Sequence, residues 1–282
     1  MTTLSEHDQQ TADFYENEFD EHLAVKSSPF NNWGYWKTNT EDAAQAGRNL
    51  VLETLKHANI TSQSRVLNVG CGFGVETIEI ASCTPCKSIV GIDISQKQIE
   101  FANSQLSHYK SDVAQKIVFQ KMSATDLQFE DESFDCVIAI DCVIHFSTRE
   151  TFFKEAKRVL KPGGHLMVAD HLHARQAEDE VDKLFLARAA KMRNLPEENN
   201  QNLEAYQNLL TQLGFQVHQA LSIKDHVFPG AFNYFLSPKY LSVYAEHLGE
   251  KRANIERVQA VSYQQFYEKG YLDYGIFSAQ KP

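Results

Sequence analysis

The chain has 282 residues, 43% of them hydrophobic and 23% charged, and 27 Lys and Arg against 37 Asp and Glu give a formal net charge of −10. These values are typical of a globular protein and exclude a disordered, collagen-like or disulfide-framework chain. The acidic balance argues against a nucleic-acid-binding protein, whose surface should be basic. No apolar run approaches the roughly 20 residues that span a bilayer.

The first ten residues, MTTLSEHDQQ, have neither the basic patch nor the apolar segment of a signal peptide. The five cysteines form an odd, sparse set that fits a reducing compartment. Both features predict a cytoplasmic protein. No internal repeat divides the chain, so we expect a single domain over residues 1–282.

Aromatic residues are spaced regularly in the first forty residues. Phe14, Tyr15 and Phe19 lie at helical spacing and predict an amphipathic helix. The asparagines and glycine of the following NNWGYW segment end that pattern. Residues 41–58 carry apolar side chains on one side and predict a second helix.

From residue 65 onward, short apolar strands alternate with helices. The expected strands are 65–70, 88–95, 116–124, 134–141 and 163–171, and the expected helices are 75–82, 96–106 and 149–160. This alternation predicts βαβ units and a parallel sheet covered on both faces, so the fold class is α/β.

The alternation stops after Asp170. Residues 174–200 are expected to be helical and charged, and a helix over 203–215 ends at Gly214. Residues 216–223 predict a sixth strand, 229–268 are mainly helical, and 270–282 predict a final strand.

A glycine-rich segment between the first strand and the next helix carries the clearest functional signal. Gly70, Gly72 and Gly74 form a G-x-G-x-G loop, and glycine allows sharp turns and close approach of a ligand. The helix behind the loop offers free N–H groups to a polar tail. Asp93 ends the second strand, where a carboxylate can bind ribose hydroxyls. The two features favour a ribose-bearing ligand over a purely structural turn.

Five segments in order resemble the class I S-adenosylmethionine-dependent methyltransferases of the small-molecule, natural-product type. They are VLNVGCGFG, GIDISQKQI, MSATDLQFEDESFD, AIDCVIHF and RVLKPGGHLMVAD. The resemblance is strong over 65–170 and weaker through LLTQLGF and LDYGIFSAQKP. NNWGYW resembles the segment that closes over the cofactor.

The resemblance implies a doubly wound, seven-stranded, mainly parallel Rossmann-like sheet with a helical cap and an antiparallel last strand. Its expected parts are an N-terminal lid (1–40), a cofactor-binding core (41–170), a cap with a late helix and strand (171–268), and the final strand (270–282).

The implied cofactor is S-adenosylmethionine, with S-adenosylhomocysteine as product. The residues that would bind it are Tyr35, Trp36, Asn68, Gly70, Cys71, Gly72, Gly74, Asp93, Ile94, Gln98, Ser123, Ala124, Asp126 and Asp141. The glycine loop would lie under the methionine part, Asp93 would hold the ribose, and Ile94 would pack on the adenine. Ser123 and Ala124 would meet the adenine edge.

Further roles follow from the same resemblance. The carbonyl of Asp141 would contact the cofactor's amino group, Gln98 would face the same pocket, and Tyr35 and Trp36 would exclude water. Asn68 stands where the family usually has an acid. Ser123 stands where an acid often binds the adenine amine, and we expect Asp126 to compensate for it.

His145 follows the fourth strand, at the sheet edge where ligands of open α/β folds bind. We hypothesise that His145 is the general base for a hydroxyl acceptor and that Asp170 orients it or the acceptor. The alternative is that His145 caps a helix or contacts the cofactor without moving a proton. Ile144 stands where some relatives carry a second histidine, which weakens a proton relay.

The sequence therefore predicts O-methylation of a small-molecule acceptor. Transfer to carbon or nitrogen is the alternative within the class, and a non-catalytic binder of the cofactor or a nicotinamide oxidoreductase are alternatives from other classes. The glycine spacing disfavours a nicotinamide cofactor. Monomer and homodimer both stay open.

Three other patterns receive less weight. Cys83 and Cys86 form a C-x-x-C with no second pair, so we expect no zinc site. His171 and His173 flank Asp170, but solvent exposure or acceptor contact is favoured over a metal site, and we expect none. The aromatic residues of 228–244 are expected in the core or around an apolar acceptor pocket.

Overall fold

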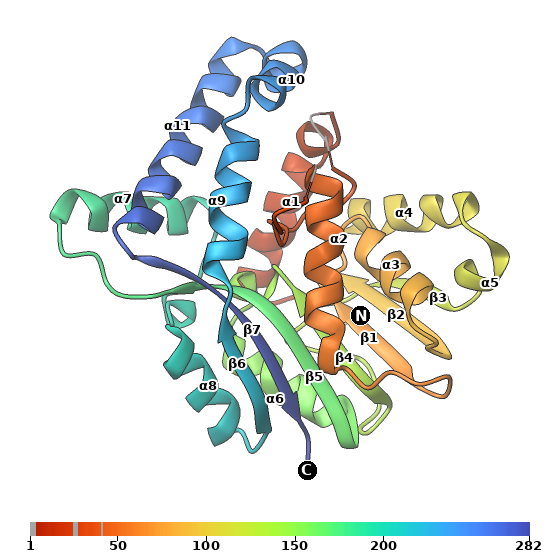
Figure 1. Ribbon diagram of the computed structural model, residues 1–282. Helices are drawn as coiled ribbons and strands as arrows, with labels where there is room; N and C mark the ends of the chain where they lie inside the picture. The colour runs from red at the N-terminus through yellow and green to blue at the C-terminus, as the bar shows by residue number, and fades with distance from the viewer. Residues whose placement is uncertain (1–3, 25–27, 41) are drawn as a thin grey trace.

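A seven-stranded sheet forms the centre of the computed structural model, which describes residues 4–24, 28–40 and 42–282 (Figure 1). The strands are β1 (Arg65–Val69), β2 (Ser88–Asp93), β3 (Ile117–Lys121), β4 (Phe134–Ile140), β5 (Leu160–His173), β6 (Gln216–Ser222) and β7 (Leu272–Gln280). Their order is β3-β2-β1-β4-β5-β7-β6.

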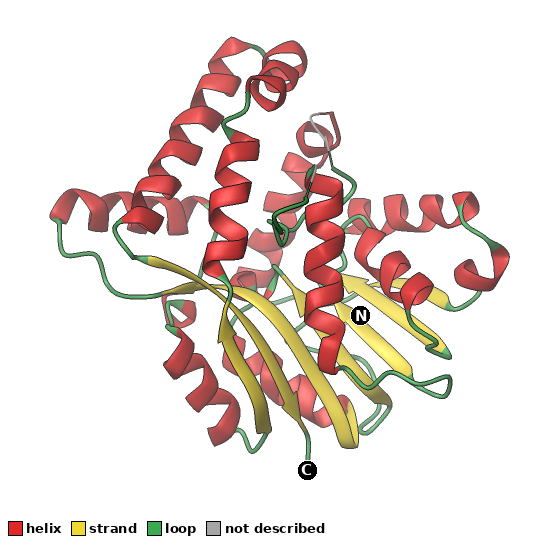
Figure 2. Ribbon diagram, viewed as in Figure 1, coloured by secondary structure: helices red, strands yellow, loops and turns green. Residues whose placement is uncertain are grey.

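The first five strands pair in parallel, and β7 runs antiparallel between β5 and β6 (Figure 2). The predicted doubly wound sheet with an antiparallel last strand is therefore confirmed. Because the order reverses beside β1, the loops after β1 and β4 open at one edge. This is the place where open α/β sheets bind ligands.

Helices cover both faces of the sheet. They are α1 (Glu6–Ala24), α2 (Ala43–Thr54), α3 (Val75–Cys83), α4 (Gln96–Gln105), α5 (Ser111–Ala114), α6 (Arg149–Val159), α7 (Glu180–Met192), α8 (Leu203–Gln212), α9 (Lys224–Phe235), α10 (Pro238–Leu248) and α11 (Glu250–Glu268). Short 3-10 turns lie at Leu55–His57, Leu106–His108, Val143–His145 and Glu197–Asn199.

The two cores follow the alternation of strand side chains. Val66 of β1 and Ile138 of β4 pack with α2, α3 and α4, whereas Leu67 and Val137 pack with α6 and α8. Successive side chains of a strand point to opposite faces, so continuous apolar runs are what a doubly covered sheet requires.

Several boundaries differ from the predictions, and the largest differences are in the helices. Of the predicted 174–200 helix only Glu180–Met192 is α-helical, and the predicted 229–268 helix is three helices, the first starting at Lys224. Gly249, at φ +83°, separates α10 from α11 because this backbone conformation cannot continue a helix. The predicted 41–58 helix spans 43–57 with its final 3-10 turn, and residue 41 lies outside the described residues.

Among the described residues, no helix is both long enough and apolar enough to cross a membrane. The upper part of Figure 1 shows α9, α10 and α11 standing above the sheet beside α7, which together form the helical cap.

Candidate active site

The glycine loop leaves β1 and enters α3 through three residues in the left-handed region. Gly70, Gly72 and Gly74 have φ values of +67°, +51° and +81°. A Cβ on Gly70 would lie 2.6 Å from the Cβ of Cys142, and one on Gly74 would lie 2.7 Å from the Cβ of Ala102. Glycine is therefore required both by the backbone conformation and by the chain packed against it.

Asp93 connects this loop to the end of β2. Its Oδ2 accepts a hydrogen bond from the Gly72 N–H at 2.9 Å, and its Oδ1 accepts one from the Ser95 N–H at 3.0 Å. Burial raises the pKa of the carboxyl, although these backbone N–H groups act in the opposite direction. The buried Gln98 side chain faces the same loop, with Oε1 3.4 Å from where a Gly72 Cβ would be. The half-buried Ile94 follows directly.

An N-terminal acid occupies the predicted adenine end. Ser123 Oγ donates to Asp8 Oδ2 at 2.9 Å, and Ser147 Oγ donates to Asp8 Oδ1 at 3.0 Å. The exposed Asp126 instead accepts from Gln128 Nε2 at 2.7 Å. The acid beside Ser123 in the structure is Asp8 of α1, and the role of Asp126 toward the adenine stays a prediction. Ala124 is buried next to Ser123, as its predicted role requires.

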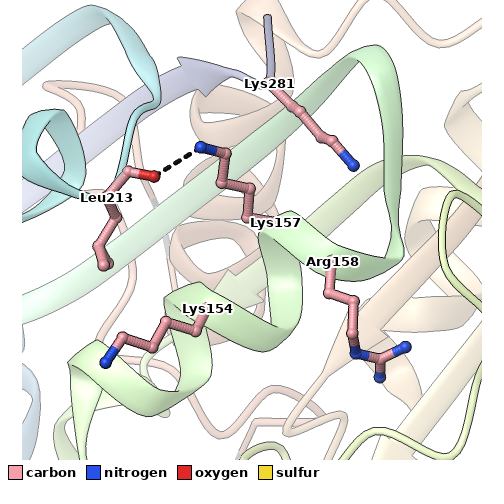
Figure 3. Close-up of a pocket in the computed structure, with 5 residues that line it drawn as sticks. All are labelled: Lys154, Lys157, Arg158, Leu213 and Lys281. Atoms are coloured by element: carbon pink, nitrogen blue, oxygen red, sulfur yellow. Dashed lines mark hydrogen bonds between the residues drawn. The ribbon is translucent and has the colours of Figure 1, made fainter.

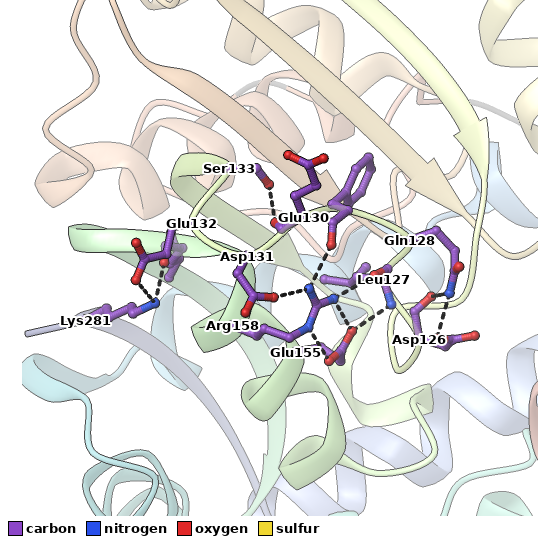
Figure 4. A network of polar contacts seen from close by, with 12 residues as sticks. Asp126, Leu127, Gln128, Glu130, Asp131, Glu132, Ser133, Glu155, Arg158 and Lys281 are labelled. Carbon is purple, nitrogen blue, oxygen red and sulfur yellow. Dashed lines mark hydrogen bonds and ion pairs between the residues drawn. The ribbon is translucent and has the colours of Figure 1, made fainter.

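A guanidinium holds the segment that follows Ser123 and Ala124 (Figure 4). Arg158 of α6 donates to the carbonyl oxygens of Leu127 and Phe129, both at 2.7 Å, and forms ion pairs with Glu155 and Asp131. Glu155 also accepts the Leu127 N–H at 2.9 Å. These contacts fix the main chain of the loop. A fixed main chain suits the predicted contact between the backbone of this segment and the edge of the adenine ring.

At the opposite end of the site, Asn32 and Trp33 reach the sheet edge. The Trp33 N–H donates to Asp141 Oδ2 at 2.7 Å, and Asn32 Nδ2 donates to Glu76 Oε1 at 2.7 Å. Tyr35 and Trp36, which were expected here, pack against helices instead. The Tyr35 N–H donates to the carbonyl of Ala46 on α2, and the Trp36 ring packs on α9. The NNWGYW segment therefore covers the site with its first half.

Two predicted polar residues lie deep in the site. Asn68 is fully buried, donates from Nδ2 to Thr77 Oγ1 at 2.8 Å, and leaves Oδ1 without a hydrogen-bond partner. Asp141 adopts φ +57° at the end of β4, and its Oδ1 lies 3.1 Å from His171 Nε2. Such a strained non-glycine backbone is typical of functional sites.

His145 ends the 3-10 turn after β4. Its Nδ1 is buried with no hydrogen-bond partner, and its ring lies edge-on to Tyr15 with 5.6 Å between centroids. Burial, with the charges of Arg193 and His171, lowers its pKa to about 3. The imidazole therefore stays neutral over the ordinary pH range.

Asp170 is fully buried and engaged with other groups. Its Oδ2 accepts from Arg149 Nε at 3.0 Å and Nη2 at 2.8 Å, and its Oδ1 accepts the Ile144 N–H at 3.2 Å. It touches the turn that carries His145 only through the backbone. Asp170 therefore reaches the neighbour of His145 in the chain, whereas His145 Nδ1 has no hydrogen-bond partner.

Aromatic rings surround Trp33 beside this edge. Its ring centroid lies 4.9 Å from that of His171, and 5.4–6.2 Å from those of Phe228, Phe232, Phe235 and Tyr263. Phe228 and Phe232 are also buried in the core. The aromatic residues of α9 and α11 therefore belong to the core and also pack around Trp33, whose N–H donates to Asp141.

A surface pocket lies away from this edge. It has a volume of about 290 Å³ and is lined by Lys154, Lys157, Arg158, Leu213 and Lys281 (Figure 3). Lys157 donates to the Leu213 carbonyl at 2.7 Å, so this cation already has a partner. Among the described residues, no three His, Cys, Asp or Glu side chains are placed to hold a metal ion.

Sequence reasoning missed four residues of this site: Asp8, Tyr15, Asn32 and Glu76. Tyr15 was used only as a sign of helical spacing. Glu76 was visible as an acid in the first turn behind the glycine loop, but no motif assigns that position a role. Asp8 and Asn32 reach the site only because the N-terminal segment folds back over it.

The comparisons with known proteins agree with this geometry. Residues 67–168 match the family model of a methyltransferase domain. The chain is 30% identical to erythromycin 3''-O-methyltransferase of Saccharopolyspora erythraea over 79% of this chain and 73% of that protein. It is 34% identical to O-methyltransferase resE of Aspergillus sclerotiorum over 79% and 81%.

The chain belongs to the class I S-adenosylmethionine-dependent methyltransferases. Solved structures agree on the fold. The [4+2]-cyclase SpnF superposes with a TM-score of 0.76 at 22% identity over 98% of this chain and 97% of that one. A cyclopropane synthase from Mycobacterium tuberculosis gives 0.82 at 15% identity over 99% and 100%.

The cofactor is accordingly S-adenosylmethionine, and the residues present fit it. The glycine loop admits close approach of the ligand, the Asp93 carboxylate stands at the end of β2, and Asn68 Oδ1 is a buried acceptor without a donor. A ligand that brings hydroxyls at one end and an ammonium at the other would satisfy these groups. The enzyme methylates a small organic molecule.

Proposed function

We propose that the enzyme methylates a hydroxyl group, with His145 as the general base. The observation that carries this proposal is a buried imidazole in the turn after β4, whose Nδ1 has no hydrogen-bond partner and can accept a proton. When bound, the cofactor supplies an electrophilic methyl group on a sulfonium. The names of relatives such as erythromycin 3''-O-methyltransferase support an oxygen acceptor.

The protein's own residues would then act on position and on one proton. Asp170, fixed by Arg149, would position the turn of His145 through the Ile144 N–H. The imidazole would accept the hydroxyl proton, a step that typically contributes about 10²–10⁴-fold in rate. α1 and Trp33 would cover the site, exclude water and hold the acceptor hydroxyl in position for methyl transfer.

His171 is the second imidazole at this edge, and unlike His145 it lies next to a carboxylate. The test compares His145→Gln with His171→Gln for turnover and for binding of S-adenosylhomocysteine. We expect His145→Gln to lose about 100-fold or more in kcat with unchanged cofactor affinity, and His171→Gln to lose less. The reverse order would assign the base to His171.

The aromatic cluster around Trp33 supports an acceptor with an apolar face. A screen of phenols, sugars and terpenoids, with methylated products identified by mass spectrometry, tests both the acceptor and the atom methylated. Products methylated at carbon or nitrogen would replace O-methylation by the alternative within the class. Absence of turnover with every acceptor would favour a non-catalytic binder.

We further propose that residues 1–282 form a single cytoplasmic domain. Its parts are the lid (1–40), the cofactor-binding core (41–170), the cap (171–268) and the final strand (270–282). We also propose that this domain does not bind nucleic acid. The net charge of −10 and five free cysteines support these assignments. Light scattering distinguishes monomer from homodimer, and a shift of labelled DNA on adding the protein would contradict the expected absence of nucleic-acid binding.

A further inference from the structure

A buried carboxyl group stands behind the glycine loop without a cationic partner. Glu76 lies in the first turn of α3 and is 8% exposed. Its hydrogen bond comes from Asn32 Nδ2 at 2.7 Å. Among the residues that the structure describes, no Lys, Arg or His forms an ion pair with it. Buried carboxylates are rarely left in this state unless a ligand completes them.

The groups that face Glu76 make its surroundings more negative. Asp141 lies close enough to raise the pKa of Glu76, and together with burial the pKa reaches about 8. Burial raises the pKa of Cys71 in the glycine loop, of Cys142 after β4 and of Tyr274 on β7, and the charge of nearby Glu76 adds to each shift. His171 lies on the far side, beside Asp141.

Position 68 is a second reason to look for a carboxylate here. By the resemblance described in the sequence analysis an acid is expected at this position, and this chain has Asn68, whose neutral amide binds Thr77 on α3. Its Oδ1 has no hydrogen-bond partner and provides an acceptor but no charge. Thr77 directly follows Glu76 on α3, so Asn68 of β1 binds the residue next to the carboxyl.

We propose that Glu76 supplies the negative charge that receives the α-ammonium group of S-adenosylmethionine, in place of the acid missing at position 68. Asn32 holds the carboxylate in position, and Asp141 binds the covering segment through Trp33. The inference concerns the cofactor alone. It therefore stands or falls independently of the acceptor and of His145.

The experiment measures binding of two ligands by calorimetry. S-adenosylhomocysteine carries the amino-acid tail, and 5′-deoxy-5′-methylthioadenosine lacks it. We expect Glu76→Gln to weaken binding of the first about 10- to 100-fold, the range for a hydrogen bond to a charged group, and to leave the second unchanged. Glu79→Gln, one turn away and paired with Arg48, is the matched control with no change expected.

A rescue separates charge from structure. Adding Asn68→Asp to Glu76→Gln should restore binding of S-adenosylhomocysteine, because the acid returns to the family's position. Equal weakening of both ligands, or no weakening of either, would overturn the proposal. If Glu76→Gln does not fold, proton release by the unaltered protein tests the proposal. The protein should release a proton on binding S-adenosylhomocysteine but not on binding 5′-deoxy-5′-methylthioadenosine. Equal release with the two ligands would overturn the proposal.

Discussion

Binding of S-adenosylhomocysteine should expel a proton from Glu76. In the free protein, burial and the neighbouring Asp141 hold the pKa of Glu76 at about 8, so about 90% of the carboxyls are protonated at pH 7. An ammonium group within hydrogen-bond distance favours the ionised form. When the carboxyl is fully ionised in the complex, binding releases about 0.9 proton from it at pH 7.

Calorimetry in buffers with different ionisation enthalpies measures this release from the slope of apparent enthalpy against buffer enthalpy. The ligand's own α-amino group is that of a free amino acid, which is already an ammonium at pH 7 and takes up almost no proton on binding. The unaltered protein should therefore release about 0.9 proton net, and Glu76→Gln should show almost no release. Equal slopes for the two proteins would refute the reasoning.

The same group affects the stability of the cofactor-free protein with a defined sign. Because the folded pKa of Glu76 is raised from 4.5 to about 8, the folded state binds more protons between these values. Stability should therefore fall as pH rises through this window, by at most about 4–5 kcal/mol. Glu76→Gln should flatten this part of a urea-denaturation profile, and an unchanged profile would place the titration elsewhere.

Three further predictions follow from the site. Asp93→Ala should weaken cofactor binding by about 1–3 kcal/mol, since a charged acceptor is lost, and unchanged affinity in calorimetry would mean that the ribose assignment is wrong. Asp170→Ala leaves the Arg149 charge buried and unpaired and should cost about 3–5 kcal/mol in urea unfolding; a loss below about 1 kcal/mol would contradict the buried pair. Gly74→Ala should destabilise more than Gly163→Ala, because both have positive φ but only a Cβ at 74 meets other atoms; equal losses would show that the loop yields.

Local sequence pattern was enough to predict the sheet and the cofactor loop. The strands at 65–69, 88–93, 117–121 and 134–140 lie inside the predicted ranges, because apolar runs bounded by polar residues depend on local pattern. Gly70, Gly72 and Gly74 occupy the left-handed region, which fits the sharp turn predicted from the glycines, since glycine adopts that conformation readily. Asp93 was found because it ends a strand beside this loop.

The packing of distant segments fixes which polar groups lie at the candidate site. Asp8 and Asn32 reach Ser123 and Glu76 only after the N-terminal segment packs over the sheet edge, at sequence separations of 115 and 44 residues. Asp126 is near Ser123 in sequence but exposed in the fold. A side chain's neighbours across such separations depend on how helices pack, which no local pattern encodes. The burial of the Glu76 carboxyl without a cationic partner among the described residues is therefore known only from the folded chain.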